Sequence, residues 1–131
     1  MDEVLLYLKS CGMFYLATSE DGQPHVRPFG AVCGFEGKLY FVTSNEKDVY
    51  RQLKKNGKVE ICAMHKGTWM RVCGEVEEDA RREARVAMMN DNAVALGDVY
   101  SEDDGLMTVF RFRYGTATFY SFSKDPKVVQ L

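Results

Sequence analysis

The sequence LYFVTSNEKDVYRQLKKN, residues 39–56, joins an apolar segment to a charged one through a few small polar residues. Its first five residues are aromatic, β-branched or apolar, which predicts a strand. Val49 and Leu53 lie four residues apart, on one face of a helix that could pack on a sheet. Either Ser44 or Asn45 is suited to begin that helix by accepting an amide hydrogen bond from its first turn.

The start of this predicted helix is also suited to binding an anion. The free amides and the dipole of a helix favour negative charge at its N-terminus. Thr43 and Ser44 add hydroxyl groups there, and Lys47 adds a positive charge that a helix alone disfavours at this end. The alternative is a solvated Lys47 compensated by Glu46 and Asp48 beside it. The glycine pattern of a P-loop or a dinucleotide fold is absent from the segment.

A second candidate anion ligand lies in the preceding apolar stretch HVRPFGAV, residues 25–32. Arg27 could point to solvent with its stem packed on the sheet. If it points inward it needs an anion, because an unpaired buried charge is too costly. A guanidinium can hold a phosphate with two parallel hydrogen bonds.

Composition limits the class of protein. The chain has 131 residues, 46% of them hydrophobic and 27% charged, which is typical of one globular domain over residues 1–131. A net charge of −2 argues against nucleic acid as a partner. No apolar run approaches the roughly 20 residues that span a bilayer, so we expect no membrane association.

The cysteines indicate a reducing compartment and no metal site. Four cysteines occur without a CxxC pair, and no signal peptide is recognisable after Met1, so we expect a cytoplasmic protein with reduced thiols. Cys62 and His65 form a single C-x-x-H without a second ligand pair, so we expect no zinc.

The remaining pattern predicts a mainly β fold with about three peripheral helices. One helix ends near Gly12, one lies in residues 44–56, and one is capped by Asp79. Short turns join the predicted strands, which lie in residues 13–19, 25–35, 39–43, 58–64, 68–78 and 107–122. The last of these stretches is predicted to form two strands around Tyr114 and Gly115. Closure into a small barrel would remove exposed edges, and a flat sheet covered by helices is the alternative.

The ordered set VRPF, LYFVTSNEK, DVYRQLKKN, VEICA and WMRVCGEV resembles the pyridoxamine 5'-phosphate oxidase-like family. The resemblance runs from Gly12 through TATFYSF. It implies a six-stranded antiparallel split β-barrel that forms a homodimer and binds FMN at the subunit interface. It is similar above all to the short members, which include general stress proteins and nitroimidazole-reductase-like proteins.

The resemblance also implies roles for particular residues. Arg27 corresponds to the strand arginine that meets the FMN phosphate, and Thr43, Ser44 and Lys47 correspond to the positions that complete phosphate binding. The backbone of Pro28 and Phe29 would run beside the flavin ring. Trp69 and Arg71 would approach flavin bound mainly by the other subunit.

The expected activity is an FMN-dependent oxidoreductase that reduces a small-molecule substrate with NAD(P)H as donor. The family's basic C-terminal substrate segment is not found after residue 122, so vitamin B6 oxidation is not expected, and no catalytic residue is assigned. Three alternatives remain open at this point. They are non-catalytic flavin binding as a carrier or stress protein, haem binding through His25 or His65, and binding of a deazaflavin.

Overall fold

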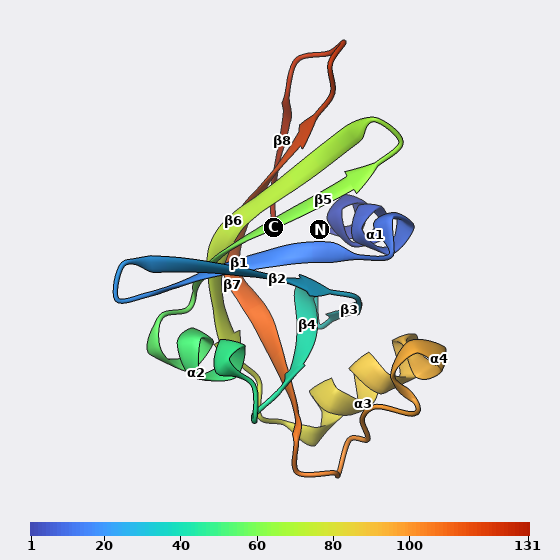
Figure 1. Ribbon diagram of the computed structural model, residues 1–131. Helices are drawn as coiled ribbons and strands as arrows, with labels where there is room; N and C mark the ends of the chain where they lie inside the picture. Colours follow the sequence, from blue (N-terminus) through green and yellow to red (C-terminus); the bar gives the residue numbers. More distant parts are fainter.

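The computed structural model describes residues 1–131 as four helices and one antiparallel sheet of eight strands (Figure 1). The mainly β prediction is confirmed. In chain order the elements are α1 (Asp2–Cys11), β1 (Phe14–Glu20), β2 (Gln23–Phe29), β3 (Val32–Phe35), β4 (Lys38–Ser44), α2 (Asp48–Lys55), β5 (Lys58–His65), β6 (Thr68–Glu78), α3 (Arg82–Asp91), α4 (Ala93–Leu96), β7 (Met107–Tyr120) and β8 (Lys127–Gln130).

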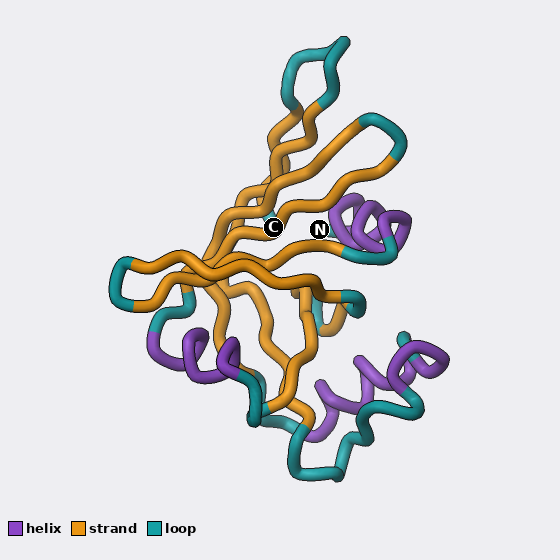
Figure 2. The backbone as a smooth tube through the Cα atoms, in the orientation of Figure 1, coloured by secondary structure: helices purple, strands orange, loops and turns teal.

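The sheet is strongly curved and does not close on itself, as a split barrel requires. Its strand order is β2-β1-β5-β6-β7-β4-β3, with β8 also paired to β7. The sheet has eight strands where the family resemblance implied six. Strand pairing is interrupted at Gly30 and Ala31, which makes β3 a separate strand, and β8 pairs with the end of β7. Figure 2 shows the β7–β8 hairpin projecting at the end of the molecule away from α3 and α4.

The prediction of two strands around Tyr114 and Gly115 is wrong, because β7 runs unbroken over 14 residues. Its first part pairs with β4 and its last part with β8, while β6 pairs with it from Phe110 to Tyr120, with a bulge between Glu75 and Val76. Gly115 lies opposite Gly74, where an added Cβ would collide with the Tyr114 carbonyl oxygen. A Cβ at Gly74 would also lie 2.9 Å from the Gly115 Cα, so this glycine pair permits close contact between the two strands and does not form a turn.

Two helices begin later than predicted. The N-cap of α2 is Lys47, whose extended backbone precedes Asp48, and no side chain caps this helix. The hydroxyl of Ser44 instead accepts a hydrogen bond from the Glu46 amide at 3.2 Å. Likewise α3 begins at Arg82, and Asp79 binds Arg81 upstream of the helix. The amides of the first turn of α2 are thus left without a side-chain acceptor.

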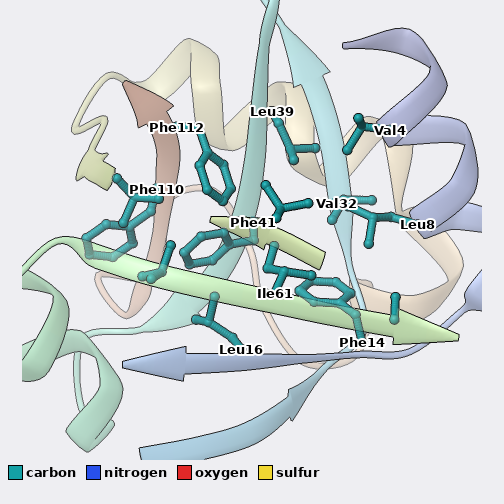
Figure 3. Packing of buried hydrophobic residues seen from close by; sticks show 14 of the residues in the cluster. Val4, Leu8, Phe14, Leu16, Val32, Leu39, Phe41, Ile61, Phe110 and Phe112 are labelled. Carbon is teal, nitrogen blue, oxygen red and sulfur yellow. The ribbon is translucent and has the colours of Figure 1, made fainter. Parts of the chain in front are cut away.

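The main core fills the concave side of the sheet. Aromatic rings dominate its centre: Phe41 stacks on Phe110 at a centroid distance of 5.9 Å, with Phe14, Leu16 and Ile61 nearby (Figure 3). A second cluster packs α3 and α4 against the other side of β3, β4 and the start of β7. None of the helices has the length and apolar character that crossing a bilayer would demand.

Candidate functional site

A cavity of about 240 Å³ lies where the end of β2, strand β4, the start of α2 and the α4 segment meet. The first three of these elements lie within one stretch of the sequence, and the α4 segment, which is far from them in sequence, packs against β4 and completes the cavity. Its lining is mostly apolar with three polar side chains: Pro28, Phe29, Gly30, Ala31, Val42, Thr43, Lys47, Ala95, Leu96, Val99 and Tyr100. Such a composition is typical of a small-molecule site.

One polar atom in this lining is unusual. The Thr43 side chain is only 2% exposed, and its Oγ1 has no hydrogen-bond partner. It is the single buried side-chain polar atom of the chain in this condition. Leaving such a group unpaired costs roughly 1–3 kcal/mol. Thr43 lines the cavity, so a ligand that enters it is one explanation for this unpaired hydroxyl.

Lys47 lies beside Thr43 at the start of α2. Its side chain is exposed and forms no ion pair. Lys47 occupies the N-cap position of α2, and no side chain hydrogen-bonds to the free amides of that helix. Lys47 brings one positive charge to this end of the cavity, and the first amides of α2 follow directly after it, while Glu46 and Asp48 on either side carry negative charge.

Arg27 points inward but does not line the cavity. Its Nη1 donates to the Leu16 carbonyl at 3.1 Å and to Thr18 Oγ1 at 3.0 Å, and its Nη2 donates to Gln52 Oε1 at 2.7 Å. None of these acceptors is a carboxylate. The guanidinium lies near the first turn of α2. Burial lowers its pKa, and the Asp48 carboxylate in that turn offsets part of this lowering.

Two more predicted residues reach the cavity from β2. Pro28 and Phe29 both line it, and the Phe29 ring contacts Phe41 edge to face at a centroid distance of 5.4 Å. Ser44 is buried next to Thr43 but does not line the cavity. Four of the eight predicted residues, Thr43 and Lys47 included, therefore share one cavity.

Trp69 and Arg71 lie elsewhere in the chain, on β6. Trp69 stacks on Tyr120 at 5.4 Å with an interplanar angle of 10°. Arg71 is exposed, and its Nε donates to Glu60 Oε2 at 2.6 Å. Neither residue lines the cavity of its own chain. Their approach to a flavin bound by another subunit stays a prediction.

The histidines and cysteines do not enter the cavity either. His25 and His65 are half-buried, and His65 packs edge-on against Tyr7 at 6.1 Å. Cys73 Sγ donates to Glu60 Oε1 at 2.9 Å, and this hydrogen bond is the main reason why its thiol pKa is raised. No group of three His, Cys, Asp or Glu side chains is placed to hold a metal ion.

The α4 wall of the cavity was missed in the sequence. Leu96, Val99 and Tyr100 come from the segment NAVALGDVY, residues 92–100, which has no strong periodicity and follows a predicted helix directly. Only the three-dimensional packing of α3 and α4 on β4 brings these residues to the cavity.

An open, curved antiparallel sheet with a few helices defines a split-barrel protein. The chain belongs to the pyridoxamine 5'-phosphate oxidase family, whose model, described as pyridoxamine 5'-phosphate oxidase, matches residues 1–121. Among curated proteins, none matches this sequence.

Solved structures agree with this assignment. A NimC/NimA family protein from Clostridium acetobutylicum is 45% identical over 100% of this chain and 92% of its own, with a TM-score of 0.96. A haem-binding protein from Mycobacterium smegmatis is 18% identical over 94% and 54%, with a TM-score of 0.75. A pyridoxamine 5'-phosphate oxidase-related, FMN-binding protein from Nostoc punctiforme is 15% identical over 99% and 90%, with a TM-score of 0.61. The last two share the fold.

Proposed function

We propose that this protein binds FMN in the cavity and uses it to reduce a small-molecule substrate. The observation that carries the proposal is the buried Thr43 hydroxyl without a partner, in a cavity that also contains Lys47. A phosphate oxygen would accept the hydrogen bond that Thr43 lacks. Lys47 and the uncapped amides of α2 would supply further donors and positive charge.

The residues present fit a phosphate group in a second way. Arg27 is half-buried and positively charged, and its hydrogen bonds go only to neutral acceptors. An anion close to the first turn of α2 would compensate this charge, as burial of an unpaired cation otherwise costs stability. Ser44 would contribute to phosphate binding because it is next to Thr43, and Pro28 and Phe29 would lie beside the flavin ring. When bound, FMN supplies hydride transfer between a nicotinamide donor and the substrate.

The cavity is small for a whole FMN molecule, which supports the proposal of a homodimer. Drug-sized ligands occupy pockets of roughly 300–1,000 Å³, and this cavity has about 240 Å³. The rest of the cofactor would be covered by a second copy of the chain. Exposed apolar side chains on the outer sheet face, such as Tyr15 and Met64, could form that contact. Trp69 and Arg71 of the second copy would then approach the flavin.

Flavin retention tests the cofactor assignment. Freshly purified wild-type protein should show a flavin absorption spectrum, and mass analysis of the compound released by heat should identify FMN. The double variant Arg27→Ala, Lys47→Ala should lose the flavin, because the charge-assisted contact of Lys47, roughly 1.5–3 kcal/mol, and the positive charge of Arg27 near the first turn of α2 both disappear. Flavin occupancy equal to that of the wild type would contradict the assignment.

The dimer has its own measurement. Trp69 is the single tryptophan, so FMN binding should quench its fluorescence strongly if the second copy places it beside the flavin. Sedimentation should give a dimer at micromolar concentration. A monomer that retains FMN without quenching would exclude the contribution of Trp69.

Turnover separates an enzyme from a carrier. The oxidoreductase proposal predicts oxidation of NADH or NADPH in the presence of a panel of small oxidised compounds. Stable FMN binding without turnover would instead favour the carrier or stress role.

All four cysteines are free thiols, which suits a reducing compartment such as the cytoplasm.

Haem and deazaflavin remain outcomes of the same experiments. Neither His25 nor His65 reaches the cavity, so haem has no histidine ligand there. A haem Soret band in place of a flavin spectrum would overturn the FMN proposal, and the mass of the released compound distinguishes a deazaflavin from FMN.

A further inference from the structure

The wall of the cavity that is formed by α4 and the residues after it differs chemically from the Lys47 end. Ala95, Leu96 and Val99 present apolar surface to the cavity, and Leu96 is buried in the second core cluster. A phosphate gains nothing from such a surface, whereas a flat apolar ring buries against it favourably. The cavity therefore has one end for an anion and one wall for a ring.

Tyr100 carries the only polar group of this wall. Its ring is half-buried, and its hydroxyl has no hydrogen-bond partner within the chain. Thr43 Oγ1 is the one buried side-chain polar atom of the chain without a partner, so the Tyr100 hydroxyl is instead open to solvent or to a ligand in the cavity. Burial is the main cause that raises the phenol pKa, and the Asp104 charge adds to it. The hydroxyl consequently keeps its proton at neutral pH and is available as a donor.

We infer that Tyr100 is a specificity-determining residue, which donates a hydrogen bond to an oxygen atom of a flat, apolar ring held between Phe29 and the α4 wall. The inference rests on the proposed function, since the phosphate of FMN would occupy the Thr43 and Lys47 end. The ring has two possible sources with the same chemistry. It is either the flavin ring, through a carbonyl group, or a separate aromatic carbonyl compound bound beside the flavin.

The test compares Tyr100→Phe with Tyr114→Phe, which makes the same chemical change on β7 at a residue that is 57% exposed and outside the cavity. One arm measures the FMN dissociation constant and the flavin absorption spectrum. The other arm measures binding of acetophenone and of ethylbenzene to the FMN-loaded protein by ligand-observed NMR. The two probes differ in one carbonyl group.

The expected loss is about three- to tenfold, the effect of one hydrogen bond. If a separate compound is recognised, wild-type protein prefers acetophenone, Tyr100→Phe loses that preference, and FMN binding is unchanged. If the flavin ring is recognised, Tyr100→Phe weakens FMN binding and shifts its absorption spectrum. Tyr114→Phe behaves as wild type in both cases. Unchanged FMN binding and spectrum together with an unchanged or absent probe preference would overturn the inference.

A second pair of variants tests the wall without touching Tyr100. Val99 and Val94 are 64% and 98% exposed, so both should tolerate a carboxylate, but only Val99 lines the cavity. Val99→Asp should weaken binding of the recognised ring, whether probe or flavin, and Val94→Asp should not. Equal effects of the two variants would contradict an α4 ring wall. If wild-type protein binds no FMN, the proposed function fails, and the probe titrations on FMN-free protein decide this inference by the same criteria.

Discussion

Two regions of the molecule bury polar groups to nearly the same degree but treat them in opposite ways. The Asp79 side chain is 4% exposed, and both of its carboxylate oxygens accept several hydrogen bonds. Thr43 is 2% exposed, and its hydroxyl has no partner. A region in which every group is paired stabilises the fold, whereas an unpaired buried group indicates a place for a ligand.

The contacts of Asp79 explain its structural role. Tyr40 donates to its Oδ2 at 2.7 Å, and Arg81 donates to both oxygens at 3.0 and 2.8 Å. Arg81 also contacts Glu36 in the β3–β4 turn, and Arg111 of β7 lies 3.8 Å from Asp79 Oδ2. The end of β6 is thereby joined to two other parts of the sheet, and these contacts hold the pKa of Asp79 well below its usual range.

Loss of the Asp79 charge should have the largest effect on stability. Asp79→Asn removes the anion that the Arg81 and Arg111 guanidinium groups face, and loss of a charge-assisted hydrogen bond costs about 1.5–3 kcal/mol, towards the lower end here because both arginines are partly exposed to solvent. Urea unfolding should therefore show a lower unfolding free energy, while FMN affinity stays within about twofold because the cavity is untouched. Asp98→Asn, at an exposed residue without an ion pair, is the matched control. An unchanged urea midpoint in Asp79→Asn would refute the structural role.

The contribution of the Asp79 charge to the unfolding free energy should depend on pH in a defined direction. The pKa of Asp79 is lowered in the folded state, so the charged form stabilises the fold above the unfolded pKa of about 3.9, and this contribution is lost as pH falls toward the folded pKa. The difference in unfolding free energy between wild type and Asp79→Asn should be constant near neutral pH and shrink below about pH 4. A difference that grows on acidification would contradict this sign.

Thr43→Val should show the opposite relation between stability and binding. The valine keeps the shape and removes the unpaired hydroxyl, so the unfolding free energy should rise by about 1 kcal/mol. FMN affinity should fall by about three- to tenfold, since the phosphate loses one donor. Thermal unfolding without FMN and a fluorescence titration with FMN measure the two effects. A destabilised Thr43→Val protein would mean that its hydroxyl is paired in solution.

Thr18→Val is the matched comparison for that variant. Thr18 is 3% exposed, but its hydroxyl donates to Gln52 Oε1 at 2.6 Å and accepts from Arg27 Nη1 at 3.0 Å. The same change should therefore lower the unfolding free energy by about 1 kcal/mol. If both threonine variants shift stability in the same direction, the distinction between the paired and unpaired regions fails.

The sequence pattern predicted helices and strands well at positions where the residue type allows only one local structure. Helix α1 ends at Gly12, which has a positive φ of 76°, and β1 follows as predicted. The pattern failed at Gly115, because a glycine between strands can serve either a turn or a close contact with Gly74. It failed again at the start of α2, where Ser44 binds the Glu46 amide outside the helix.

The site was predictable in part for the same reason. Thr43 and Lys47 are close in sequence, so the helix N-terminus already predicted that they act together, and the structure brings them into one cavity. Tyr100 could not be found, because its position depends on how α4 packs against a sheet formed by other segments. Arg27 has the inward orientation that the sequence left open, but its partners Thr18 and Gln52 could not be read from spacing alone.

The most direct test compares the affinities of FMN and riboflavin, which differ only in the phosphate. Wild-type protein should bind FMN about 100-fold more tightly, because Lys47 would contribute roughly 1.5–3 kcal/mol through a direct contact with the phosphate and the nearby Arg27 charge would add to it. Lys47→Met should reduce this ratio by about tenfold or more. Lys54→Met, at the other end of α2, should leave the ratio unchanged. Equal affinities of the wild-type protein for FMN and riboflavin would contradict a phosphate site at the start of α2.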